Sequence, residues 1–146
     1  MVLYQDIAKA VTTVIKGAFP NVPIYGDEVK EGYKKPSFFV GILPVSSINH
    51  TKSIKEEQLL ITISYFSNTT DTLKNYSVMQ ELKVAFGQVL GVDNRKFTIQ
   101  ETNTQKVGED GDIYQFTFDI NYYELACHEP DSVLVGEIIY KRKGSD

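Results

Sequence analysis

The sequence is poor in the residues that build disulfides, metal sites and membrane spans. Of its 146 residues, one is cysteine, two are histidine and none is tryptophan. A single cysteine, Cys127, excludes an internal disulfide and favours synthesis in a reducing compartment. No apolar run approaches the ~18 residues that a membrane span needs. The N-terminus also lacks a cationic segment followed by a continuous apolar one, so we expect neither a signal peptide nor a membrane partner.

An excess of basic residues is also missing. The formal net charge is −4, and the one run of three basic residues is Lys141-Arg142-Lys143 near the C-terminus. A protein that binds nucleic acid through its phosphates normally carries a clustered basic excess. We therefore expect no sequence-specific contact with nucleic acid.

Catalytic and ligand-binding motifs are absent as well. The chain contains no G-x-S-x-G, H-E-x-x-H, C-x-x-C, G-x-G-x-x-G or phosphate-loop pattern. His50 and His128 lie in segments expected to be loops, and Cys127-His128-Glu129 lacks the spacing of metal ligands. The acidic residues around Gly108 and Gly111 fit a turn better than a calcium loop, whose closing glutamate is missing. The sequence thus predicts no catalytic residue, no metal and no cofactor.

The strongest periodic signal runs from Asp112 to Leu125. Large apolar residues alternate there with polar ones, and the apolar set is Tyr114, Phe116, Phe118, Ile120 and Tyr122. A period of two predicts a strand with one buried face and one wet face. Burial of each apolar side chain contributes about 1.5–3 kcal/mol, so we expect the rest of the chain to cover this face.

Two segments have the period of an amphipathic helix. The first is Leu3–Ala18, which Gly17 and Pro20 should end. The second is Thr72–Leu90, preceded by N-cap candidates in Asn68–Asp71 and followed by Gly91 as a stop. Its apolar stripe contains Leu73, Tyr76, Met79, Leu82, Phe86, Val89 and Leu90.

Several shorter segments have the composition of strands. Pro23–Tyr25 is extended, and Gly26–Lys35 is expected to be a loop or a hairpin turn. Ser37–Leu43 should be a strand that Pro44 ends, and Val45–Ser53 a mobile loop. The next strand, Gln58–Phe66, alternates and places Leu59, Ile61, Ile63 and Tyr65 on one face.

A hairpin is predicted where Phe97–Val107 and Asp112–Leu125 flank a Gly-Glu-Asp-Gly sequence. A two-residue turn at Glu109-Asp110 or at Asp110-Gly111 would place the same residues of the two strands on the same face of the hairpin. Phe97 and Ile99 would then lie beside Ile120 and Tyr122. The aromatics nearer the turn would share a side with Glu101, Asn103 and Gln105. Val133–Tyr140 is a further strand-like segment, expected to be an edge strand or an arm.

The order of elements is therefore α-β-β-β-α-β-β with a possible last strand, in one domain over residues 1–125, followed by an extension or arm over 126–146. The segment Ala18–Ser46, with its Phe19-Pro20, Ile24-Tyr25 and Pro36–Phe39 motifs and its Glu28/Gly32 loop, resembles the phage tail terminator family of prophages and phage-tail-like particles of Gram-positive bacteria. The later Ile61/Ile63/Tyr65 strand and the Asp110-Gly111 hairpin complete the resemblance. It covers about residues 1 to 125.

The resemblance implies an α+β fold, with helices on one side of a mostly antiparallel sheet, and no enzymatic residues. It also implies a homo-hexameric ring that caps a finished tail tube. Its partners would be other copies of the chain, the tail tube protein and, in some particles, a sheath or head connector protein. Such a protein would be made in the host bacterial cytoplasm and reside in a virion or phage-tail-like particle.

Length and polarity, rather than a family pattern, select the candidate contact regions, which are the Val45–Lys55 loop, the Gln100–Ile113 hairpin and the terminal arm. The candidate interaction residues are Asn49, His50, Lys52, Lys55, Thr102, Thr104, Glu109, Asp110, Asp112, Val133, Val135, Ile138 and Tyr140. Two other functions stay open at this point. One is a head-tail connector or another minor tail protein, and the other is a small-ligand-binding or enzymatic α+β domain.

Overall fold

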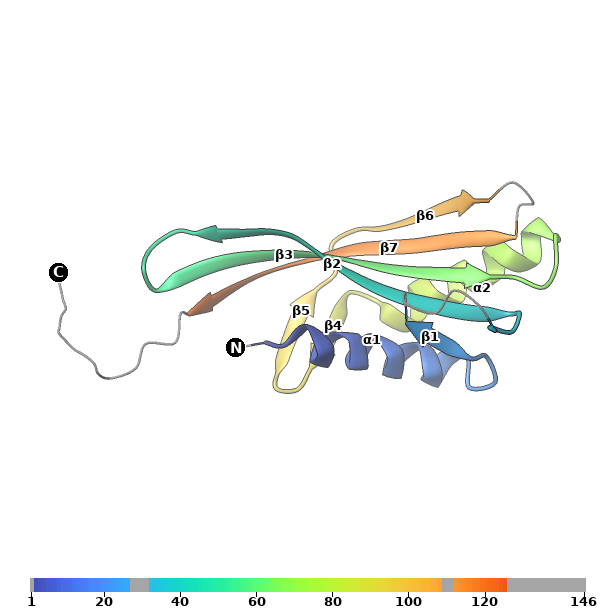
Figure 1. The fold of residues 1–146 in the computed structure, drawn as a ribbon, viewed down its shortest axis with the longest axis horizontal. Helices are drawn as coiled ribbons and strands as arrows, with labels where there is room; N and C mark the ends of the chain where they lie inside the picture. The colour runs from blue at the N-terminus through green and yellow to red at the C-terminus, as the bar shows by residue number, and fades with distance from the viewer. Residues whose placement is uncertain (1, 27–31, 109–111, 126–146) are drawn as a thin grey trace. The chain divides into compact units, whose positions relative to one another are not determined.

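The computed structural model describes residues 2–26, 32–108 and 112–125, and has the predicted α+β architecture (Figure 1). The elements in chain order are α1 (Tyr4–Ala18), β1 (Ile24–Gly26), β2 (Ser37–Asn49), β3 (Ile54–Phe66), α2 (Thr72–Phe86), β4 (Val89–Val92), β5 (Arg95–Thr98), β6 (Thr102–Val107) and β7 (Ile113–Leu125). Contacts divide the chain into two compact units. The larger contains 2–46 and 57–122, and the described part of the smaller contains 47–56 and 123–125.

A five-stranded, mostly antiparallel sheet forms the centre of the fold, with strand order β1-β2-β3-β7-β6. In the larger unit, α1 and α2 lie on the same side of this sheet (Figure 1). A second, two-stranded antiparallel sheet consists of β4 and β5. The predicted fold class is therefore confirmed, whereas the predicted order of elements lacks β4 and merges β5 with β6.

The core lies between the helices and the central sheet. Every second residue of β7 from Tyr114 to Tyr122 is buried, as the alternation predicts, and so is every second residue of β3 from Leu59 to Tyr65. The ring of Phe86 at the end of α2 lies 5.1 Å from that of Phe118. Helix α1 contributes its buried side chains at steps of four residues, Ile7, Val11 and Ile15, because that spacing keeps them on one helix face.

Helix α2 is shorter than its apolar pattern predicts. It begins after Asp71, whose carboxylate accepts hydrogen bonds from the N–H groups of Leu73 and Lys74, so an N-cap in the predicted segment is confirmed. It ends at Gly87 rather than at Gly91. Gly87 has φ of 62°, a left-handed conformation that glycine adopts at low cost. The two residues assigned to the last helical turn, Val89 and Leu90, instead belong to β4.

The prediction of a loop at Val45–Ser53 is right only for residues 50–53, because β2 continues past Pro44 to Asn49 and β3 begins at Ile54. Proline lacks the N–H donor of a strand ladder and is tolerated on edge strands. The pairing of β2 with β1 ends at Val40, so the following part of β2 extends beyond its neighbour on that side. Pro44 is therefore compatible with the strand that it was expected to end.

The hairpin alternative for Gly26–Lys35 is also wrong. Strand β1 pairs with β2 in parallel, with Ile24 opposite Phe38 and Gly26 opposite Val40. A parallel pair needs a connection that returns the chain to the starting end of the first strand, and a tight turn cannot provide one. Part of this connection, residues 27–31, lies outside the described residues.

The predicted Phe97–Val107 strand is two strands in two sheets. Arg95–Thr98 forms β5 and pairs with β4, whereas β6 begins at Thr102 and pairs with β7. The predicted register is wrong as well, because Thr102 lies opposite Phe118 and Thr104 opposite Phe116. The connection from Val107 to Ile113 is also longer than a two-residue turn, and this extra length shifts every pair.

A second group of aromatic side chains lies on the sheet face away from the core. Phe38 packs on the core residue Tyr65, with ring centroids 5.0 Å apart, so the next residue, Phe39, points to the opposite face. The ring of Phe39 lies 4.7 Å from that of Phe66, and Tyr33 contacts both edge-on at 5.2 and 5.3 Å. This face of the sheet is therefore partly apolar.

Candidate interaction surfaces

The turn between β2 and β3, in the smaller unit, is held by backbone and hydroxyl hydrogen bonds. The N–H of His50 donates to the carbonyl of Ile54 over 2.9 Å. The hydroxyl of Thr51 accepts from the N–H groups of Ser53 and Ile54 at 3.1 and 3.0 Å. Turns of this kind satisfy the polar backbone groups that the ladder leaves unpaired. The tip is thus an ordered hairpin end that carries three of the predicted contact residues, Asn49, His50 and Lys52.

His50 is tied to its own hairpin. Its Nε2 lies 2.7 Å from Oε1 of Glu56, and its ring lies 5.9 Å from that of Tyr123 at the end of β7. The imidazole is exposed, as are the predicted contact residues Lys52 and Lys55. Nothing in this arrangement resembles a nucleophile with its base, because the partners are one carboxylate and one aromatic ring.

The same unit exposes several apolar side chains, which we call the tip patch. The exposed fraction is 47% for Ile48, 37% for Ile54, 58% for Tyr123 and 78% for Leu125. Single exposed apolar residues are normal, whereas a group of them beside polar residues is typical of a protein interface. Ile48 and Ile54 lie in the predicted Val45–Lys55 contact region, but none of the four residues was a predicted contact, because polarity selected the candidates.

Strand β6 forms one edge of the central sheet, and it carries two further predicted residues. Thr102 is half-buried and Thr104 is exposed. On one side β6 pairs with β7; on the other, no strand of the described part of the chain adds to it. Such an edge presents backbone N–H and C=O groups to a partner.

Asp112, the next predicted contact residue, has partners within its own fold. Its Oδ2 lies 3.0 Å from Nζ of Lys35, and its carbonyl accepts a hydrogen bond of 2.8 Å from the N–H of Ser67. These contacts connect the start of β7 with the segments before β2 and after β3. An ion pair as exposed as this one contributes about 0–1 kcal/mol to stability. We therefore interpret the contacts of Asp112 as local ones, which hold the start of β7 beside Lys35 and Ser67.

The remaining predicted contact residues, Glu109, Asp110, Val133, Val135, Ile138 and Tyr140, lie outside the described residues. The same is true of Cys127 and His128.

A polar groove of about 450 Å³ lies at the start of β6, and we call it the acidic groove. Its lining has two carboxylates, three side-chain amides and one hydroxyl, from Gln58, Thr98, Gln100, Glu101, Asp119 and Asn121. No lysine, arginine or histidine is among these lining residues. Carboxylate and amide oxygens in such a groove accept hydrogen bonds, so its chemistry suits cationic donors.

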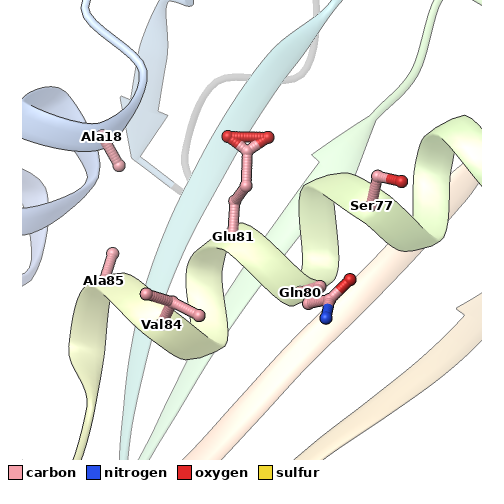
Figure 2. Close-up of a pocket in the computed structure, with 6 residues that line it drawn as sticks. All are labelled: Ala18, Ser77, Gln80, Glu81, Val84 and Ala85. Carbon is pink, nitrogen blue, oxygen red and sulfur yellow. The ribbon is translucent and has the colours of Figure 1, made fainter.

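A second groove of about 530 Å³ lies along α2 near the end of α1. Figure 2 shows its lining, with Ala18, Val84 and Ala85 on the apolar side and Ser77, Gln80 and Glu81 on the polar side. Val84 is 77% exposed. Glu81 is the one carboxylate in this lining, which contains no histidine, lysine or arginine.

Titratable groups give no sign of an active site in the described ranges. No cluster of three or more His, Cys, Asp or Glu side chains there could hold a metal ion. Burial raises the pKa of Tyr65 above its usual 10.0, and a hydrogen bond with Ser67 partly opposes that shift. A tyrosine held neutral in the core is a structural residue. Among residues 2–26, 32–108 and 112–125, no helix is both long and apolar enough to cross a membrane.

Residues 6–132 match the model of the family described as phage tail terminator protein. The chain belongs to the phage tail terminator family. The match spans most of the chain, includes the whole described fold after the start of α1, and stops before Val133. Membership in this family indicates a structural role in phage tails and thus agrees with the absence of catalytic motifs.

Two solved chains superpose on this chain at low sequence identity. One solved chain superposes with a TM-score of 0.50 at 11% identity, covering 85% of this chain and 96% of the other. A chain from the virion of a native gene transfer agent particle gives a TM-score of 0.46 at 10% identity, covering 84% of this chain and 91% of the other. No curated protein sequence matches the chain.

Proposed function

We propose that this terminator forms a closed ring, a homo-hexamer, on the last ring of tail tube subunits and thereby stops tube polymerisation. The family match over residues 6–132 is the observation that carries the proposal. In a particle with a head, the opposite face of the ring meets the head connector protein. The protein acts through its shape and contacts, so it needs neither a cofactor nor a reaction.

The surfaces of the chain support this proposal. A ring of identical subunits with head-to-tail contacts requires two different, complementary surfaces on each subunit. The fold offers the open edge of β6 in the larger unit and the tip patch around Ile54 in the smaller one. Extended strand edges and exposed apolar side chains are the features through which such contacts form.

The experiment is a measurement of tail length in particles made with and without this protein. If the chain ends tube growth, its loss gives overlong tails with a broad length distribution, and supplying it again restores one length. A head-tail connector or another minor tail protein would instead leave tails of normal length that fail to join heads. Tails of normal length in the absence of this protein would overturn the proposal.

Native mass spectrometry of the purified protein tests the ring separately. We expect a single closed oligomer at micromolar concentration, of the six copies that the family resemblance implies. A species that stays monomeric at high concentration, also when mixed with the tube protein, would contradict the ring.

A further inference from the structure

Strand β6 is the best available edge of the central sheet for another strand. It has six residues, of which Asn103 to Lys106 are exposed, and it contains neither proline nor glycine. The opposite edge strand, β1, has three residues, and β2 carries Pro44 where it extends beyond β1. Proline blocks strand addition, and short edges offer few hydrogen bonds. An extended partner should therefore add to β6.

The acidic groove lies at the N-terminal end of this same strand. Glu101 immediately precedes β6, and Asp119 follows Phe118, the residue that pairs with Thr102. A strand that runs antiparallel along β6 would pass Val107 first and leave beside Thr102, next to these two carboxylates. A partner suited to both features has a strand-forming segment followed directly by cationic residues.

The C-terminal part of this chain has that order. Val133–Tyr140 reads V-L-V-G-E-I-I-Y and contains four β-branched residues, and Lys141-Arg142-Lys143 follows at once. The family match stops at residue 132, so the segment is additional to the matched terminator domain. We propose that Val133–Tyr140 of a neighbouring copy adds antiparallel to β6, and that its basic triplet enters the acidic groove. The proposal rests on the proposed assembly of copies.

Strand direction assigns the arm to a neighbouring copy. Strand β6 is antiparallel to β7, and the arm follows the end of β7 in the chain. An arm that folds back along its own sheet runs opposite to β7 and hence parallel to β6. Its basic triplet would then reach the Val107 end, away from Glu101. Only an arm that arrives in the antiparallel direction, from another copy, places the triplet at the groove.

The charge match also sets the register. With Lys141 opposite Glu101, Tyr140 lies opposite Thr102 and Ile138 opposite Thr104. Residues directly opposite in an antiparallel pair have Cα atoms about 4.5–5.5 Å apart, within the separation that a disulfide spans. A pair of cysteines can therefore report the contact.

The test is a cross-link in the Cys127→Ser background, which removes the native thiol. Thr104→Cys combined with Ile138→Cys should give a ladder of covalent multimers on a non-reducing gel after mild oxidation, and reduction should collapse it to monomer. Asn103→Cys with Ile138→Cys is the matched control, because residue 103 points to the other face of the strand. We expect at least about tenfold less cross-link from this control.

Two results would overturn the inference. One is an intramolecular disulfide, seen as a monomer of altered mobility, because it would place the arm on its own subunit. The other is no cross-link in a protein that native mass spectrometry shows to be oligomeric and whose circular dichroism matches wild type. A wild-type protein that is itself monomeric would instead contradict the proposed ring, so the two failures are distinguishable.

Charge reversal tests the groove. Glu101→Lys should weaken assembly about tenfold at low salt, as should Lys141→Glu, because each places like charges together. Combining the two should restore assembly, since the pair is exchanged. Lys9→Glu, at an exposed position of α1, is the matched control and should leave assembly unchanged. If the double variant assembles no better than the worse single variant, Lys141 does not lie beside Glu101 and the register is overturned.

Discussion

The rings of Phe97 and Tyr122 lie 4.9 Å apart, although the two residues belong to strands of different sheets. Phe97 is in β5 of the small sheet, and Tyr122 is in β7 of the central sheet. The guanidinium carbon of Arg95 lies over both rings, 5.1 and 5.3 Å from their centroids. This aromatic pair with its cation connects the small sheet to the core, because both rings are at least 95% buried.

Truncation of Phe97 should destabilise the fold far more than loss of the cation. Phe97→Ala removes a buried ring, which costs about 3–5 kcal/mol in the free energy of unfolding. Arg95→Ala should cost no more than about 1 kcal/mol, since exposed cation–π contacts are weak. Urea denaturation followed by circular dichroism measures both values, with Val89→Ala in the exposed part of β4 as a control. Equal losses for Phe97→Ala and Arg95→Ala would contradict the ranking.

The sequence correctly predicts that Phe97 lies beside Tyr122. The predicted reason, a single hairpin that contains both residues, is wrong. Alternation identifies the buried face of β7 because that pattern is local to one strand. It does not reveal that the chain leaves one sheet after Thr98 and enters another at Thr102, because sheet membership depends on distant partners. Likewise, the register of β6 depends on the length of the connection to Ile113, which the Asp-Gly signal underestimates.

Candidate surfaces were harder to predict than the fold. Polar, long segments pointed to the β2–β3 connection, whose tip does carry exposed Asn49 and His50. The tip patch was only partly anticipated: Ile48 and Ile54 lie inside the predicted Val45–Lys55 contact region, but polarity selected only polar residues there as candidate contacts. The acidic groove was missed for a different reason, since its residues come from β3, β5, β7 and the segment between β5 and β6. No local pattern brings such residues together.

The buried Asn75 should be important for stability. Its Oδ1 lies 2.6 Å from the hydroxyl of Ser67, and its Nδ2 donates to the carbonyl of Thr69 over 3.1 Å. Asn75→Ala should cost about 1–3 kcal/mol, because buried partners lose their hydrogen bonds. In a double-mutant cycle with Ser67→Ala, the two losses should not add, since both variants break one network. Strict additivity in urea denaturation would contradict this.

Tyr114 presents the opposite case. Its side chain is fully buried, and its hydroxyl has no hydrogen-bond partner among the described residues. An unsatisfied buried hydroxyl costs about 1–3 kcal/mol. Tyr114→Phe removes that hydroxyl and keeps the ring that packs 5.4 Å from Tyr76, so we expect a melting temperature equal to or above that of wild type. A marked fall would indicate a partner for the hydroxyl.

Tyr65 should make the fold sensitive to alkaline pH. Burial raises the pKa of its phenol above 10.0 in the folded state. At pH 8 the phenol is neutral in both the folded and the unfolded state, so it does not change how the free energy of unfolding varies with pH there. As the pH rises from 10 through the folded pKa, the unfolded chain loses its proton first, and stability falls. The difference in unfolding free energy between wild type and Tyr65→Phe should therefore shift against wild type between pH 8 and pH 11. A constant difference would contradict the raised pKa.

The tip patch should contribute to assembly rather than to folding. Ile54 is partly exposed at the start of β3, and Ile48 lies near the end of β2. Ile48→Asp with Ile54→Asp places two charges in a surface that the proposed function assigns to a contact. Burying a charge without a partner is costly, so this variant should lose most of its oligomer in native mass spectrometry and cap tubes poorly. Its melting temperature should change by no more than a few degrees.

The control is Leu73→Asp, which changes one exposed apolar residue of α2 to the same acid. Leu73 is 78% exposed and belongs to the larger unit, outside the tip patch. This variant should assemble like wild type, since its change lies away from the surface under test. If Leu73→Asp abolished the oligomer while the tip variant kept it, the contact would lie on α2 at Leu73. In that case the tip patch would not be the contact surface. The proposal of a ring would stand, because the oligomer would then depend on the surface that Leu73→Asp changes.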